Sequence, residues 1–160
     1  MYVSAGSNVA PEVHLAEACR ELTHRFGAIE VSSVYRNPAV GFAGDDFLNL
    51  VLRFRTAESP QVVVAELERL HRLAGRVRGS ERFAPRTLDL DLLLYGDAVR
   101  SGENFRVPRE DILKYGFVLG PMAELAPELR HPVTGHTMAE HWSRFDRDSH
   151  PLQRLGALGF

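Results

Sequence analysis

The sequence has little cysteine and no long hydrophobic run. Cys19 is its only cysteine, which excludes an intramolecular disulfide and a cysteine-ligated zinc site and favours a reducing compartment. No apolar stretch approaches the roughly 18 residues of a membrane span. The first residues also lack the basic segment of a signal peptide. We therefore expect a cytoplasmic protein.

Lysine is nearly absent, since Lys114 is the only lysine among 19 basic residues. No Gly-Lys-Ser or Gly-Lys-Thr occurs, so there is no lysine-bearing phosphate loop, and phosphate binding would rely on arginine, backbone and metal. The 19 basic and 21 acidic residues give a net charge of -2, which argues against bulk binding to nucleic acid or membranes. The length of 160 residues, with 44% hydrophobic and 25% charged residues, predicts a single domain over 1–160.

Apolar spacing predicts two amphipathic helices and four strands in the order βαββαβ. The helices are expected at residues 11–26 and from Pro60, with Ser59 as N-cap, to a terminal Gly75. The strands are expected at residues 1–5, 29–35, 47–55 and 88–95. This order is typical of a ferredoxin-like α+β fold, whose antiparallel-rich sheet has its helices on one face and leaves the other free for a site. Short C-terminal helical extensions are expected at residues 110–114, 121–125 and 138–142, and the last dozen residues are expected to be poorly ordered.

The last predicted strand carries a pair of carboxylates. Alternation places Leu88, Leu90, Leu92 and Leu94 on one face, and Asp89 and Asp91 on the other. Carboxylates two residues apart on a strand lie about 6 to 7 Å apart, which suits a hard cation such as Mg²⁺ bound together with phosphate oxygens. The preceding residues 75–86 read as a loop that could close arginines over phosphates: Arg76, Arg78, Arg82 and Arg86. The alternative is a set of solvated surface pairs.

A second group of residues lies on the third predicted strand. Phe47 and Asn49 share its free face, where an aromatic ring and an amide would suit a flat heterocycle such as a pterin or purine. The alternative is a surface strand with an incidental aromatic residue. The spacing of His131, His136 and His141 does not place them on one helical face, so we expect no metal site there.

Five motifs carry a resemblance to a known family: Gly6-Ser7-Asn8, Tyr35-Arg36-Asn37-Pro38, Phe47-Leu48-Asn49, Gly75-Arg76-Val77-Arg78 and, above all, Arg86-Thr87-Leu88-Asp89-Leu90-Asp91-Leu92-Leu93-Leu94-Tyr95-Gly96. From residue 1 to about residue 127 the chain resembles the 6-hydroxymethyl-7,8-dihydropterin pyrophosphokinases. The resemblance implies transfer of pyrophosphate from ATP to the pterin hydroxymethyl group, with release of AMP, in folate biosynthesis.

The resemblance also implies residue roles. Asp89 and Asp91 would hold two Mg²⁺ ions, and Asn49 would recognise the pterin edge. Arg76, Arg78 and Arg86 would contact phosphates or order the closing loop. Further contacts are implied at Phe47 and Phe117 on the two pterin faces, at the backbone of Asn37, Pro38 and Val40 around the pterin, and at Leu92 near the adenine. No protein partner is indicated.

Two of the departures from the family pattern concern positions that face the nucleotide in the family. Arg109 stands where the family usually has histidine, and Tyr115 where it usually has arginine. Arg109 would still be able to contact ATP phosphate, but Tyr115 removes a cation, and a lost transition-state donor commonly costs about 10²-fold or more in rate. The alternative function is therefore a divergent paralogue that binds pterin or nucleotide without efficient transfer, or acts on a different hydroxymethylpterin. An RNA-binding ferredoxin-like domain is disfavoured by the negative net charge and the missing Lys/Arg-Gly-Phe/Tyr signature.

Overall fold

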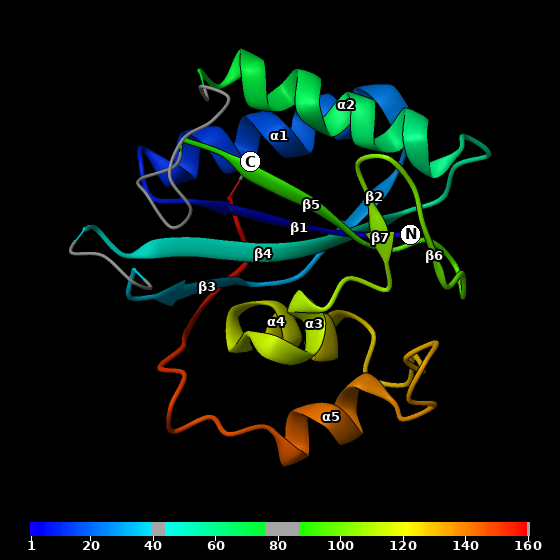
Figure 1. Ribbon diagram of the computed structural model, residues 1–160. Helices are drawn as coiled ribbons and strands as arrows, with labels where there is room; N and C mark the ends of the chain where they lie inside the picture. The colour runs from blue at the N-terminus through cyan, green and yellow to red at the C-terminus, as the bar shows by residue number, and fades with distance from the viewer. Residues whose placement is uncertain (40–43, 76–86, 160) are drawn as a thin grey trace.

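The computed structural model describes residues 1–39, 44–75 and 87–159 and is built around an antiparallel sheet (Figure 1). The strand order is β5-β1-β4-β3-β8, with β2 also paired to β4. The first part of the chain forms β1 (Tyr2–Ser7), α1 (Pro11–Phe26), β2 (Ile29–Val31), β3 (Val34–Asn37), β4 (Phe47–Phe54), α2 (Pro60–Leu73) and β5 (Asp89–Leu94). The second part forms β6 (Arg100–Ser101), β7 (Arg106–Val107), α3 (Asp111–Lys114), α4 (Gly116–Leu125), α5 (Met138–Arg144) and β8 (Gln153–Gly156).

The α+β class and the ferredoxin-like order are confirmed, and both long helices form where their signals predict. The Ser59 hydroxyl accepts a hydrogen bond from the Val62 N–H at 3.3 Å, which caps α2. α1 and α2 lie together on one side of the sheet in Figure 1. Between them and the sheet lies the first hydrophobic cluster, which includes Leu15, Leu22, Leu50, Leu67 and Leu90. These apolar faces hold the two helices against the sheet.

The opposite face of the sheet is partly covered, although the sequence analysis leaves it free. α3, α4 and α5 lie on this side in Figure 1, and α4 packs against β4. Seven of the ten residues of α4 are buried, so this helix needs cover on most of its circumference. The sheet and α5 supply it through a second hydrophobic cluster, which includes Val51, Leu93, Leu119, Met122 and Met138.

The strand boundaries and faces differ from the expectation in three places. β1 continues through Ser7 instead of ending at Ala5. The predicted strand 29–35 is divided into β2 and β3, because the Ser32 hydroxyl accepts the Val51 N–H at 3.0 Å in place of a backbone carbonyl. The prediction for Leu94 was wrong: the pairing of β1 with β5 shifts register next to it, and Leu94 packs in the second cluster.

The C-terminal residues form an edge strand, although a poorly ordered end was expected. β8 pairs antiparallel with β3, and Arg154 Nε lies 3.2 Å from Glu124 Oε1 of α4. The partners of β8 are far away from it in the sequence, so no local sequence pattern indicates this strand. Among the described residues, no helix has the length and apolar character that crossing a membrane requires.

Candidate active site

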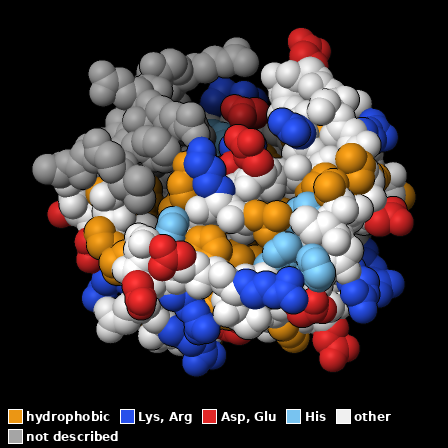
Figure 2. All heavy atoms as spheres, turned by 60° about the horizontal axis from the view of Figure 1, so that its bottom comes forward, with side chains coloured by type: hydrophobic (Ala, Val, Ile, Leu, Met, Phe, Trp, Pro, Cys, Tyr) orange, Lys and Arg blue, Asp and Glu red, His pale blue; other side chains and the backbone are white. Residues whose placement is uncertain are grey.

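Three strands place the predicted metal and pterin residues in one row. Gly6 of β1 is paired with Asp89 of β5 on one side and with Asn49 of β4 on the other. Directly paired residues point to the same face of a sheet, so Asp89 and Asn49 share a face at a Cα separation of about 10 Å, two strand spacings. Asp91 lies two residues further along β5, paired with Ser4. Figure 2 shows acidic and basic side chains side by side near the upper centre of the α4–α5 side of the molecule.

Gly6 is the part of this row that the sequence analysis missed. A Cβ atom at Gly6 would lie 2.5 Å from Asn49 Oδ1, closer than such contacts occur. The backbone of Gly6 does not adopt a positive φ, so space and not conformation requires glycine here. The motif Gly6-Ser7-Asn8 reads as a turn, and only the pairing with Asn49 reveals why the first residue has no side chain.

The predicted pterin residues meet at one end of β3 and β4. The Asn49 side-chain amide donates a hydrogen bond to Asn37 Oδ1, and Asn37 Nδ2 donates to the Pro38 carbonyl at 3.0 Å. Both asparagines are buried, and Asn37 is paired with Phe47 across the strands. The structure thus brings Asn37, Pro38, Phe47 and Asn49 together, whereas Val40 lies outside the described residues.

Phe117 lies in the first turn of α4, on the side of the sheet that carries Asn49. Its ring is stacked on that of Tyr115, with centroids 5.0 Å apart and planes 18° apart. The ammonium of Lys114 lies 5.3 Å from the centroid of the Tyr115 ring. Tyr115 therefore covers one face of Phe117, and the only lysine of the chain lies beside the position where the family usually has arginine.

Arg109 lies between two carboxylates. Its Nη2 is 3.5 Å from Asp91 Oδ1, and its Nε is 3.2 Å from Asp111 Oδ2, in a direction that makes no hydrogen bond. Burial alone would lower the pKa of Arg109, but the charges of Asp91 and Asp111 outweigh it, so the pKa is raised. The guanidinium is thus a permanent cation beside one of the two predicted metal ligands. Asp111 is a further residue that the sequence analysis missed. The only feature of the sequence that points to its contact with Arg109 is that the two residues are two positions apart.

The remaining predicted residues have less support from the structure. Leu92 lies in the first hydrophobic cluster, on the face opposite Asp89 and Asp91, so its side chain faces the core beneath the helices. A contact of Leu92 with adenine would therefore have to use its backbone. Arg76, Arg78 and Arg86 lie outside the described residues.

Glu124 joins three elements behind the site. Its carboxylate accepts hydrogen bonds from the Ser33 N–H at 2.8 Å, the Tyr35 hydroxyl at 2.6 Å and Arg154 Nε at 3.2 Å. Burial would raise the pKa of Glu124, but these hydrogen bonds together lower it. The carboxylate thus holds α4 and β8 against β3, the strand that carries Asn37.

The histidines near the C-terminus form a structural cluster. The His141 ring centroid lies 5.8 Å from that of His131 and 5.7 Å from that of His136. His131 Nδ1 accepts hydrogen bonds from two backbone N–H groups, and His141 Nε2 is 2.6 Å from the Thr134 hydroxyl. Within the described ranges, no group of three or more histidine, cysteine or acidic residues is arranged to hold a metal ion.

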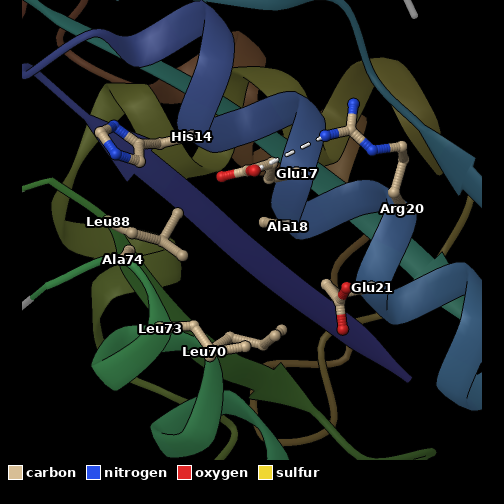
Figure 3. A pocket seen from close by; sticks show the side chains of 9 residues that line it. All are labelled: His14, Glu17, Ala18, Arg20, Glu21, Leu70, Leu73, Ala74 and Leu88. Atoms are coloured by element: carbon tan, nitrogen blue, oxygen red, sulfur yellow. Dashed lines mark ion pairs between the residues drawn. The ribbon is translucent and has the colours of Figure 1, made fainter.

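A separate hollow lies between α1 and α2 (Figure 3). Its lining includes the buried Leu70 and Leu88, the exposed Leu73, and the ion pair of Glu17 and Arg20 at 3.8 Å, both of which are well exposed. It lies on the helix-covered side of the sheet, away from the face of Asp89 and Asn49. We therefore assign the candidate active site to the other face.

Comparisons with known proteins identify the family of the chain. The family model described as 7,8-dihydro-6-hydroxymethylpterin-pyrophosphokinase matches residues 2–127. The 2-amino-4-hydroxy-6-hydroxymethyldihydropteridine pyrophosphokinase of Synechocystis sp. is 36% identical over 142 residues, which cover 86% of this chain and 72% of that protein. The protein of the same name from Aquifex aeolicus is 32% identical over 137 residues, which cover 83% of this chain and 84% of that protein.

A fungal relative is much longer. The folic acid synthesis protein fol1 of Pneumocystis carinii is 28% identical over 156 residues, which cover 95% of this chain but 21% of that protein. The chain therefore spans about a fifth of this relative. The matches show a class of ATP-dependent pyrophosphokinases. This chain belongs to the 7,8-dihydro-6-hydroxymethylpterin-pyrophosphokinase family, whose members transfer pyrophosphate from ATP to hydroxymethyldihydropterin in folate biosynthesis.

Proposed function

We propose that this chain transfers pyrophosphate from ATP to 6-hydroxymethyl-7,8-dihydropterin on the sheet face that carries Asp89, Gly6 and Asn49. One observation supports this most directly: a carboxylate and a buried amide face the same way across a residue that has no side chain. Asn49 Oδ1 lies over Gly6, in the space that a side chain there would fill, so the amide reaches from β4 over β1, the strand that separates β4 from β5 and Asp89.

The reaction needs positioning more than a strong base. The substrate hydroxyl oxygen attacks the β-phosphorus of ATP and loses its proton, while the bond from the β-phosphorus to the oxygen bridging it to the α-phosphorus breaks and AMP leaves. Such transfers depend on alignment and on neutralising phosphate charge. We propose that Asn49, Phe47 and Phe117 align this hydroxyl. Asn49 would hydrogen-bond to the edge of the pterin ring, and Phe47 and Phe117 would contact the two faces of the ring.

The donor set fits magnesium. Asp89 and Asp91 are neighbouring carboxylates on one strand face, and Mg²⁺ commonly takes one or two carboxylates with substrate phosphates and water. We propose that they bind two Mg²⁺ ions, which when bound would supply charge neutralisation for the phosphates. Arg109 and, by resemblance, Arg76, Arg78 and Arg86 would contact the phosphates. The adenine of ATP would lie near the Leu92 backbone. We also propose that the protein is located in the cytoplasm.

The first experiment measures AMP formation from ATP and 6-hydroxymethyl-7,8-dihydropterin. Asp89→Ala and Asp91→Ala should each abolish it, whereas Asp97→Ala, which changes an exposed aspartate just past β5, should leave it unchanged. Turnover like that of the unmodified protein in either of the first two variants would refute the metal assignment.

The second candidate, a paralogue without efficient transfer, is favoured by Arg109 and Tyr115 alone. Arg109 is paired with Asp91, and Tyr115 is stacked on Phe117, so both side chains already have contacts within the chain. Under this hypothesis, Arg109→His combined with Tyr115→Arg should raise turnover strongly. If the unmodified protein has measurable activity and the double variant has the same turnover, the paralogue hypothesis is excluded.

A further inference from the structure

The pairing of Arg109 bears on how a metal enters the proposed site. The Arg109 N–H donates to the Leu93 carbonyl at 2.9 Å, which holds this residue beside β5. Its guanidinium then reaches Asp91 Oδ1 at 3.5 Å and Asp111 Oδ2 at 3.2 Å. The side chains of Arg109, Asp91 and Asp111 are 37%, 28% and 22% exposed, so this group is screened less than a surface ion pair.

A guanidinium and a metal ion compete for the same carboxylate. Arginine keeps its charge at every relevant pH, so it cannot release Asp91 by losing a proton. A divalent cation that approaches Asp91 Oδ1 while Arg109 is in contact with it meets electrostatic repulsion at short range. The pair is therefore an obstacle to metal binding unless Arg109 finds another acceptor.

Nucleotide phosphates are the acceptors that a guanidinium fits best, because its planar set of donors matches their oxygens. Among the described residues, the buried Arg109 Nε makes no well-directed hydrogen bond, although it lies 3.2 Å from Asp111 Oδ2, so its contacts with carboxylates leave its hydrogen-bonding capacity incompletely used. Asp111, the first residue of α3, contacts the guanidinium at Nε, whereas Asp91 contacts it at Nη2.

We propose that Arg109 is an internal counter-ion of Asp91, positioned by Asp111, and that nucleotide phosphates draw it away so that metal and nucleotide bind cooperatively. This inference rests on the proposed function, because it takes Asp91 as a metal ligand. Coupling between two sites is reciprocal: if nucleotide raises metal affinity, metal raises nucleotide affinity by the same factor. Arg109 and Asp111 are positioning residues in this account.

The test titrates Mn²⁺ into the protein with and without a non-hydrolysable ATP analogue, and free Mn²⁺ is followed by its electron paramagnetic resonance. Arg109→Gln should tighten Mn²⁺ binding to the nucleotide-free protein by about tenfold, within the usual range of site-to-site coupling. The gain in affinity from the analogue should shrink in the same variant. Arg100→Gln, which removes the same charge from β6, where the guanidinium lies 5.6 Å from the Phe105 ring centroid, should leave both affinities unchanged.

Asp111 is tested by a double-mutant cycle. Asp111→Asn should loosen Arg109 from Asp91 and so tighten Mn²⁺ binding to the nucleotide-free protein, and this gain should be absent when Arg109→Gln is also present. Equal effects in both backgrounds would show that Asp111 acts by its charge alone and would refute its positioning role. If Arg109→Gln does not fold, Arg109→Met removes the charge from a side chain of similar length.

The outcomes separate the two proposals. Unchanged Mn²⁺ affinity of nucleotide-free Arg109→Gln, together with its loss in Asp91→Asn, would overturn the counter-ion inference and leave the metal site standing. Unchanged Mn²⁺ affinity in Asp91→Asn would overturn the metal assignment itself.

Discussion

Replacing Gly6 by alanine perturbs the site through a single methyl group. The new Cβ would lie 2.5 Å from Asn49 Oδ1, so the Asn49 side chain has to rotate. Asn49 is buried and donates to Asn37, so rotation breaks a hydrogen bond that water cannot easily replace. Because Gly6 does not have a positive φ, alanine causes no backbone strain of its own.

Two opposing effects set the change in the free energy of unfolding. Alanine in a strand interior stabilises by about 0.5 to 1 kcal/mol relative to glycine. Leaving the buried Asn37 oxygen without its donor costs about 1 to 3 kcal/mol. The net loss of stability should thus be about 1 kcal/mol, which leaves the protein folded. Pterin affinity should fall more: two lost hydrogen bonds of about 1 kcal/mol each correspond to about 30-fold weaker binding.

Calorimetric titration of 6-hydroxymethyl-7,8-dihydropterin, in the presence of Mg²⁺ and a non-hydrolysable ATP analogue, measures this loss. Asn49→Ala alone should weaken binding to a similar extent, and adding Gly6→Ala to it should change little, because the side chain that clashes is gone. Binding by Gly6→Ala as tight as that of the unmodified protein would refute the reasoning, as would a full further loss in the Asn49→Ala background.

Three further predictions concern stability. His71→Ala leaves the buried Leu90 N–H, now 2.7 Å from His71 Nε2, without its acceptor. In a urea titration this variant should lose about 2 to 3 kcal/mol, and an unchanged midpoint would contradict the assigned contact. Glu124→Gln should cost about 1 to 2 kcal/mol at neutral pH. Since the folded pKa of Glu124 lies below the usual 4.5, its contribution is present above that value and is lost as pH falls through the lowered pKa, so the variant should show a flatter acid denaturation curve than the unmodified protein. Burial and the charge of His141 lower the pKa of His131, so the folded state holds this proton less tightly than the unfolded state does. Stability should therefore fall as pH drops below about 6.5, and His131→Asn should reduce the difference between denaturation curves measured at pH 7.5 and 5.5; an equal difference in that variant would contradict the assignment.

The long helices and the acid pair could be predicted because their signals are local. α1 and the start of α2 follow from apolar spacing, proline at the first turn and the Ser59 cap, all of which act within one or two turns. The shared face of Asp89 and Asp91 follows from strand alternation in the same way. Alternation failed at Leu94 because a register shift in the pairing with β1 reversed the face, and nothing in the sequence of β5 marks that shift.

The sequence by itself determined the α+β class, the family and the kinds of residues available at the site, because periodicity, caps and motifs depend on near neighbours in the chain. Only the tertiary structure decided how those residues combine. It placed Gly6 between Asp89 and Asn49, brought Arg109 against Asp91, covered Val51 with α4 and added β8 to the edge of the sheet. Each of these is a contact between residues far apart in sequence, and such contacts depend on strand register and packing of the whole core.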